Sequence, residues 1–95
     1  MIFRWDEDKA RTNQSKHGVS FLEATLVWDD PLHDLHLDRV VDGEERWWVI
    51  GHVAPGGVLI VVHVYPDPDD EGCVRLISAR RATRHEQKRF KDGDL

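Results

Sequence analysis

Basic side chains gather near the end of this 95-residue sequence, where residues 75–91 hold seven Lys and Arg residues and a single acid. Arg80 and Arg81 precede the start of a predicted helix, where free backbone amides also favour an anion. Three more basic residues have the i, i+4, i+7 spacing of one helix face: Arg84, Lys88 and Lys91. The pattern indicates a phosphate-binding surface. It equally fits a solvated helix whose charges pair with acids elsewhere in the chain.

A second candidate group lies in the middle of the chain, where Glu45 and Arg46 are followed by Trp47 and Trp48. A carboxylate and a guanidinium suit proton transfer and phosphate contact, and they are also ordinary charges at the start of a strand. Because neighbours in a strand point to opposite faces, one tryptophan should enter the core and the other should lie outside. An outward tryptophan can stack on a base, or it can pack under a helix.

The six histidines do not form a metal-binding pattern. His33 and His36 are three residues apart, which on a strand places them on opposite faces, and His52 and His63 fall on different predicted strands. No cysteine or carboxylate stands at ligand spacing from them, so we expect no zinc site and no cofactor.

The charge is distributed unevenly along the chain. The formal net charge is -5, and residues 18–74 contain twelve acids against two arginines. An acidic surface repels phosphate, so the negative total argues against a nucleic-acid binder with a uniformly basic surface. The separation of charge instead invites two partners of opposite sign.

These residues must be positioned by the elements that the hydrophobic pattern predicts over one domain, residues 1–95. Asp6 can cap a helix over about Glu7 to Lys16, and a second short helix follows Ser20. Period-two alternation then predicts four strands, which begin near Leu35, Arg46, Val58 and Val74. Thr83 should cap a last helix that ends near Lys91 and has few apolar residues, so we expect it to fray unless something binds it.

Short turns at Asp42–Gly43 and Pro55–Gly57 favour an antiparallel meander, because parallel strands need long crossovers. We therefore expect an α+β fold, with a four-stranded antiparallel sheet packed against two N-terminal helices and a C-terminal helix. No apolar run is long enough for a membrane helix and the chain opens with no export signal, so we expect no contact with a membrane and a cytoplasmic location.

Several segments, in this order and spacing, resemble the BrnT family, the toxins of type II toxin–antitoxin modules. The resemblance runs from Phe3 to Phe90, and its segments are Phe3-Arg4-Trp5-Asp6, Lys16-His17-Gly18-Val19-Ser20-Phe21, Glu45-Arg46 and Ile77-Ser78-Ala79-Arg80 with Thr83 and Glu86. The resemblance implies a RelE-like fold and a metal-independent endoribonuclease that cleaves RNA and inhibits translation. It further implies a hetero-oligomer with a BrnA-like antitoxin that carries a ribbon-helix-helix-type DNA-binding part. The complex, rather than the toxin alone, would bind operator DNA and repress its own operon.

The matching positions suggest chemical roles. RNA cleavage without a metal needs a base for the 2′-hydroxyl, cations for the pentavalent phosphate and an acid for the leaving oxygen. We hypothesise that Glu45 or a histidine is the base, and that His17 or His85 supplies the proton. The residues expected to contact phosphate and the rest of the RNA are basic: Arg46, Arg80, Arg81, Lys16, Arg84 and Lys88. His17 could equally cap the carbonyls at the end of the first helix.

Two positions depart from the family pattern. Many relatives have a basic residue where this chain has Val58, and Phe90 replaces an aromatic that is often tyrosine, so no hydroxyl there can transfer a proton. These departures and the acidic total favour an alternative, a degenerate and catalytically weak toxin homologue that acts as a protein-binding module. A DNA-binding regulator acting alone fits less well, because no helix-turn-helix pair is evident.

Overall fold

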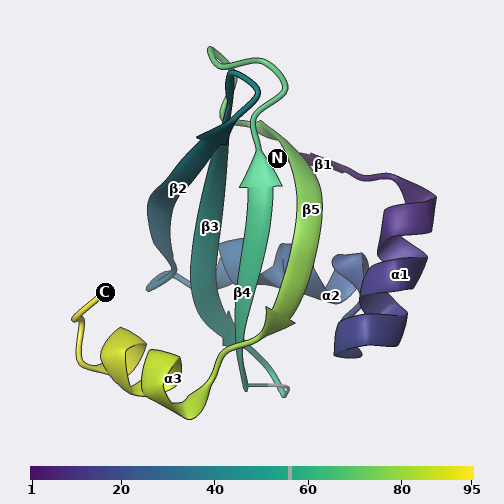
Figure 1. Cartoon of the computed structure of the whole chain (residues 1–95). Coiled ribbons are helices and arrows are strands. Elements are labelled where there is room, and N and C mark those ends of the chain that lie inside the picture. The colour runs from purple at the N-terminus through teal and green to yellow at the C-terminus, as the bar shows by residue number, and fades with distance from the viewer. Residues whose placement is uncertain (56) are drawn as a thin grey trace.

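The computed structural model describes residues 1–55 and 57–95, so Gly56, in the predicted turn at Pro55–Gly57, lies outside the described residues. The chain forms a sheet with helices on both sides (Figure 1). Its elements in chain order are β1 (Ile2–Arg4), α1 (Glu7–His17), α2 (Phe21–Ala24), the 3-10 helix η1 (Thr25–Asp29), β2 (Asp34–Val41), β3 (Glu44–Val53), β4 (Gly57–Val64), β5 (Cys73–Arg81) and α3 (Arg84–Lys91).

The sheet has five strands in the order β1-β5-β4-β3-β2. The predicted antiparallel meander is confirmed for β2 to β5, but the prediction of a purely antiparallel four-stranded sheet is wrong, because β1 joins the edge parallel to β5. This strand has three residues, and its partner Cys73–Arg75 lies far away in the sequence, so no local turn signal reveals the pairing. The Asp42–Gly43 turn is confirmed, with positive φ angles of 51° and 78° that suit a tight hairpin.

The N-terminal helices begin at the predicted caps. The Asp6 carboxylate accepts the backbone N–H groups of Asp8 and Lys9, and Gly18 ends α1 in a left-handed conformation. The second helix differs from the prediction, because it makes one α-helical turn and then tightens into η1. This segment lies close to β3 at Gly51, where an added Cβ would come within 2.9 Å of the Val27 side chain.

Asn13 completes the edge of β5 beyond the point where β1 ends. Its side-chain amide donates to the carbonyl oxygens of Val19 and Ala79, both at 2.9 Å, and its side-chain oxygen accepts the Ala79 N–H at 3.0 Å. The buried Asn13 side chain thus pairs with the backbone groups of Ala79, which β1 does not reach and which would otherwise be left unpaired.

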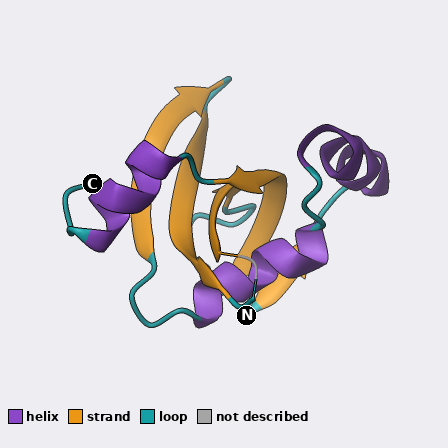
Figure 2. Cartoon of the chain, turned by 90° about the horizontal axis from the view of Figure 1, so that it is seen from below, coloured by secondary structure: helices purple, strands orange, loops and turns teal. Residues whose placement is uncertain are grey.

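The two faces of the sheet are covered differently. One face packs against α1, α2 and η1 through the larger core cluster, which includes Phe21, Val27, Val49, Leu59 and Leu76. On the other face, α3 covers only the end where Ile50, Val58, Ile60 and Ala82 meet Phe90 and Leu95. Seen from below (Figure 2), the C-terminal helix lies on the side opposite α2 and η1. Most of this second face has no helix over it, and we call it the open face.

His63 is a polar residue inside the larger core. Its side chain is fully buried, with its ring centroid 5.0 Å from that of Trp28 and 5.3 Å from that of Tyr65. Burial lowers the pKa of this imidazole to about 4, so the ring is neutral in the folded protein at neutral pH. His63 is therefore a core residue on the covered side of the sheet.

Candidate active site on the open face of the sheet

The open face is organised in rows that run across the strands. The hydrogen-bonded register places His36, Trp48, Val62 and Ser78 in one row, and Asp34, Ile50, Ile60 and Arg80 in the next. The rows alternate with residues that point into the larger core, since side chains change face at each step along a strand. Residues from four strands thus meet on one surface.

A cleft of about 360 Å³ opens in the middle of this surface. Its lining comes from β2 to β5 and α3 and consists of Asp38, Trp48, Ile60, Val62, Ser78, Arg80 and Glu86. An apolar base with polar and aromatic walls is typical of sites that hold a small ligand or one unit of a polymer.

Arg80 is held at the edge of this cleft by a carboxylate from α3. Its two terminal nitrogens donate to the two Glu86 oxygens at 2.8 and 3.0 Å, the bidentate geometry that arginine favours. This hydrogen bonding lowers the pKa of Glu86 to about 2 and raises the pKa of Arg80. The side chain of Arg80 is still 42% exposed, so the guanidinium is fixed and remains open to an anion.

The same carboxylate begins α3. The Thr83 N–H donates to Glu86 Oε1 at 2.8 Å, and the Glu86 N–H donates to the Thr83 hydroxyl at 3.1 Å. The predicted capping box is therefore confirmed. One glutamate serves both the helix and the arginine, so the position of Arg80 depends on the folding of α3.

Arg46 lies two residues before Trp48 on β3 and therefore on the same open face. Its Nε is buried and has no hydrogen-bond partner within residues 1–55 and 57–95, which leaves a cationic donor unsatisfied. From strand geometry, the Cα atoms of Arg46 and Arg80 are roughly 16 Å apart on this face, and of the two Arg80 alone lines the cleft. Two phosphates, one on each side of a nucleotide, fit this separation better than one shared phosphate.

Glu45 points to the other side of the sheet from Arg46. It lines a different cleft of about 400 Å³ near the Asp42–Gly43 turn, with Trp47, Tyr65 and Glu71 among the lining residues. Trp47 and Trp48 lie on opposite faces, as predicted. The expectation that one enters the core and the other lies outside is wrong, because both are half-buried. The structure therefore brings Arg46 and Arg80 onto one face and does not bring Glu45 to them.

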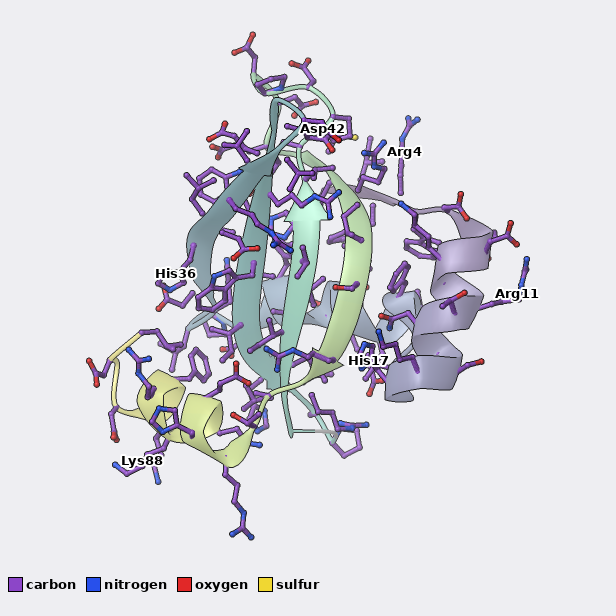
Figure 3. All side chains as sticks on the ribbon, in the orientation of Figure 1. Arg4, Arg11, His17, His36, Asp42 and Lys88 are labelled. Carbon is purple, nitrogen blue, oxygen red and sulfur yellow. The ribbon has the colours of Figure 1, made fainter. Side chains whose placement is uncertain are left out.

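His17 and Lys16 lie at the C-terminal end of α1, beside the β5 edge. They line a shallow cleft of about 370 Å³ that also includes Ile77 and Ser78. Ser78 lines the central cleft as well, so the two hollows meet at that residue. In Figure 3, His17 lies at the β5 side of the sheet and His36 at the β2 side.

The other predicted RNA contacts, Arg81, Arg84 and Lys88, are exposed at the end of β5 and on α3. Lys88 points away from the sheet in Figure 3, and its ammonium group pairs with Asp92 at 2.8 Å. These charges extend the basic surface beyond the cleft and do not line it.

The sequence interpretation did not identify three residues at or beside the cleft. These are Asp38, His36, which stacks on Trp48, and Glu86, which pairs with Arg80. The His36 ring stacks on Trp48 with centroids 4.3 Å apart and planes at 16°, and its Nε2 lies 3.1 Å from Asp34 Oδ2. The alternation of His36 and Asp38 with Leu35 and Leu37 was the available signal, because it puts both polar residues on one face.

No group of three or more His, Cys, Asp or Glu residues in the described part of the chain is arranged to hold a metal ion. None of the helices in that part has the length and apolar character to cross a membrane.

The fold and the open face together define a small α+β protein with Arg46 and Arg80 on the sheet face that also holds a cleft, an arrangement suited to binding a phosphate-bearing ligand. A sequence profile described as "Ribonuclease toxin, BrnT, of type II toxin-antitoxin system" matches residues 5–86. The chain belongs to the BrnT family, which confirms the resemblance seen in its sequence.

A solved structure supports the same fold. The chain is similar to the Brucella abortus ribonuclease toxin BrnT, whose crystal structure was determined at 1.1 Å resolution. The TM-score is 0.60 at 22% sequence identity, and the match covers 88% of this chain and 100% of that chain. No curated protein sequence matches the chain. The mixed sheet with its three helices is thus the fold of a BrnT protein.

Proposed function

We propose that this protein is the toxin of a type II toxin–antitoxin module, an endoribonuclease that cleaves RNA on its open face and so inhibits translation. One observation carries the proposal: in a chain of the BrnT family, Arg46 and Arg80 lie on the same open face of the sheet, where Arg80 lines a cleft. The chain would act in the cytoplasm as a single domain over residues 1–95 with the RelE-like arrangement that the sequence predicts. The uncovered sheet face opposite α1 and α2 supports this arrangement.

The chemistry needs no group beyond those of the chain and its substrate. The 2′-oxygen of a ribose attacks the adjacent phosphorus, the bond from phosphorus to the 5′-oxygen breaks, and a 2′,3′-cyclic phosphate and a 5′-hydroxyl end form. One group removes the 2′ proton, another gives a proton to the 5′-oxygen, and cations stabilise the pentavalent phosphate between them. Arg46 and Arg80 are both permanently charged. Arg80, which the pair with Glu86 fixes beforehand, would stabilise the phosphate that reacts, and Arg46 would position the substrate through the neighbouring phosphate.

For the proton transfers, we propose His36 as the histidine that the sequence left open. Its ring stacks on Trp48 in the cleft wall, and its buried Nε2 lies 3.1 Å from Asp34 Oδ2 without forming a hydrogen bond in the described part of the chain. Glu45 and His17 stay predicted catalytic residues, and a substrate that reaches them would extend around an edge of the sheet. Lys16, Arg81, Arg84 and Lys88 would hold the RNA on either side of the cleft.

Regulation would follow the family pattern. We propose that a BrnA-like antitoxin with a ribbon-helix-helix-type part neutralises the toxin, and that their hetero-oligomer binds operator DNA. The acids between residues 18 and 74 support a partner with basic segments.

A direct test compares wild type, Arg80→Ala and Arg11→Ala. Arg11 is a matched control, because it is an exposed arginine on α1, paired with Asp8 and far from the open face (Figure 3). Tightly controlled expression of wild type and Arg11→Ala should stop growth and shorten cellular RNA, while Arg80→Ala should do neither. Purified wild type should cut RNA equally well with EDTA present. Absence of both toxicity and cleavage in the wild type would refute the proposal.

The same assay divides the roles of the proton-transfer candidates. Glu45→Gln, His17→Ala and His36→Ala should each be compared with wild type at saturating RNA. Loss of turnover with unchanged circular dichroism assigns a role in catalysis, and unchanged turnover removes that residue from the mechanism.

The binding-module alternative also has an observation in its favour. Three basic side chains of the C-terminal end are already paired with carboxylates: Arg75 with Glu44, Arg80 with Glu86 and Lys88 with Asp92. Fewer charges are thus left for phosphate than the sequence indicates. Incubation with RNA over a range of salt concentrations separates the two functions, because a nuclease shortens the RNA and a binder leaves its length unchanged.

A further inference from the structure

The wall of the central cleft is an aromatic surface turned toward the cavity. His36 on β2 stacks on one face of the Trp48 indole, with nearly parallel planes and a centroid separation of 4.3 Å. This separation is close to the spacing of neighbouring strands, so the two rings stand upright, side by side across the strands. The second face of the indole must therefore point away from β2, over β4, where Trp48 lines the cleft.

The cleft has the width of a slot for one flat ring. Its base is formed by Ile60 and Val62 of β4, and its far side by Ser78 and Arg80 of β5. Because β4 lies between β3 and β5, the two walls stand about 10 Å apart at their backbones. A planar ring in contact on both faces needs about 7 Å between its neighbours, which leaves room for the wall side chains to reach in from each strand.

Polar groups at the two sides of the slot differ in charge. Arg80 provides a fixed cation that is paired with Glu86, and Asp38 provides a carboxylate at the β2 side. The Asp38 side chain is 38% exposed, and its Oδ2 lies 3.5 Å from the Nε of Arg39. Arg46 lies on the same face, one row beyond Trp48 on β3. A ligand that suits all of these has a flat ring, an anionic group on its backbone and hydrogen-bond donors on the edge of its ring.

We propose that this cleft is a nucleobase-binding slot that selects guanine, a subsite that rests on the ribonuclease function proposed above. One base stacks on the free face of Trp48, continuing the stack begun by His36, and its flanking phosphates meet Arg46 and Arg80. A carboxylate only accepts hydrogen bonds, and guanine presents two adjacent donors, N1–H and the 2-amino group, to its two oxygens. Adenine, cytosine and uracil lack this pair of adjacent donors, so Asp38 favours guanine.

A guanidinium group of a partner protein is the competing planar occupant. It could stack on Trp48 and pair with Asp38, but Arg46 on the same face, whose buried Nε has no hydrogen-bond partner in the described part of the chain, repels a second cation. A base carries no such charge, and its phosphates are attracted by the same arginine. The observations therefore favour a nucleotide.

The test uses the full chain and four nucleoside monophosphates. Binding is followed by tryptophan fluorescence, and by isothermal titration calorimetry in the variants that replace Trp48 itself. GMP should quench the wild type at concentrations at least about tenfold below those needed for AMP, CMP or UMP, because guanine alone offers the carboxylate two adjacent donors. Trp47→Leu, on the opposite face, should behave like wild type. Trp48→Leu should weaken GMP binding about tenfold or more. Asp38→Asn should leave binding of AMP unchanged and remove the preference for GMP.

Trp48 also packs against the smaller core, so Trp48→Phe accompanies Trp48→Leu and keeps an aromatic ring in the slot. Asp38→Asn changes a partly exposed side chain and should fold normally. Unchanged GMP binding in the folded Trp48 variants, or an unchanged preference in Asp38→Asn, overturns the slot. Quenching by an arginine-rich peptide that GMP does not displace also overturns it.

Cleavage-site mapping on a long RNA separates the failure of this inference from that of the proposed function. Wild type should cut next to guanine, and Asp38→Asn should cut with a relaxed sequence preference. If wild type binds GMP selectively but cuts no RNA, the ribonuclease proposal fails while the slot stands. If wild type cuts RNA and binds all four nucleotides equally, the slot fails while the ribonuclease proposal stands.

Discussion

Glu86→Gln tests whether the ion pair with Arg80 holds α3 and the cleft together. The substitution removes the negative charge and keeps an oxygen that can accept the Thr83 N–H, so the capping box is perturbed little. Arg80 then loses its charged partner while its own charge is unchanged. The expected effect is a loss of stability that depends on pH.

The magnitude follows from the depressed pKa of the glutamate. The Glu86 carboxyl group has a pKa of about 2 in the folded protein, against an ordinary value of 4.5. Its ionised form therefore stabilises the fold at neutral pH. Since each tenfold change in proton affinity is worth about 1.36 kcal/mol, the ceiling is about 3.4 kcal/mol. Arg80 and Glu86 are 42% and 27% exposed, so solvent screening reduces the expected loss to about 1–1.5 kcal/mol.

Urea unfolding at several pH values measures this contribution. Because the folded-state pKa is the lower one, the contribution is complete above pH 4.5 and disappears as the pH falls toward 2. Wild type should therefore be more stable than Glu86→Gln at pH 7, and the two should converge near pH 2. Asp92→Asn, which breaks the exposed pair with Lys88, should cost less than about 0.5 kcal/mol. Equal stability of Glu86→Gln and wild type at pH 7 would refute the reasoning.

Three further predictions concern the frame of the site. Asn13→Ala should cost about 2–4 kcal/mol in urea unfolding, because it leaves backbone groups of β5 unpaired, whereas exposed Gln14→Ala should cost under about 0.5 kcal/mol; similar losses would contradict this. As the pH falls, His63 takes up a proton in the unfolded chain before it does so in the folded one, so the free energy of unfolding should decrease between pH 6.5 and 4, by about 2 kcal/mol at pH 5. His63→Leu should flatten this pH dependence, and an unchanged pH dependence would count against the prediction. Gly51→Ala should lower the thermal midpoint, since its Cβ would lie 2.9 Å from Val27; an unchanged midpoint would show that η1 yields freely.

The elements of this fold could be predicted where the signals are local. The Asp6 and Thr83 caps, the Asp42–Gly43 turn and the alternation of β2 to β5 each depend on neighbouring residues, and the structure has them at the expected places. The strand β1 could not be predicted, because three residues carry little pattern and its partner in β5 is distant in the sequence. The 3-10 turn after Ala24 likewise depends on close packing at Gly51.

The candidate site divides in the same way. Arginine side chains such as Arg46 and Arg80 indicate phosphate contact, and strand alternation predicts which residues of one strand share a face of the sheet. The pairing of Arg80 with Glu86 spans a strand, a turn and the first turn of a helix, a separation of six residues that matches no regular period. A bulge between Leu37 and Arg39 changes the register beside Asp38, and only the folded sheet reveals which residues its carboxylate faces.

The central claim, that Arg46 and Arg80 on the open face act on RNA, is tested most directly by cleavage of one defined RNA by purified, folded variants. Wild type and Arg11→Ala should cut it at equal rates and leave 2′,3′-cyclic phosphate ends. Arg46→Ala and Arg80→Ala should each be at least about 100-fold slower, because the first loses a contact that positions the substrate and the second loses the charge that stabilises the reacting phosphate. Cleavage at the wild-type rate by both arginine variants would contradict the claim, as would intact RNA after incubation with wild type.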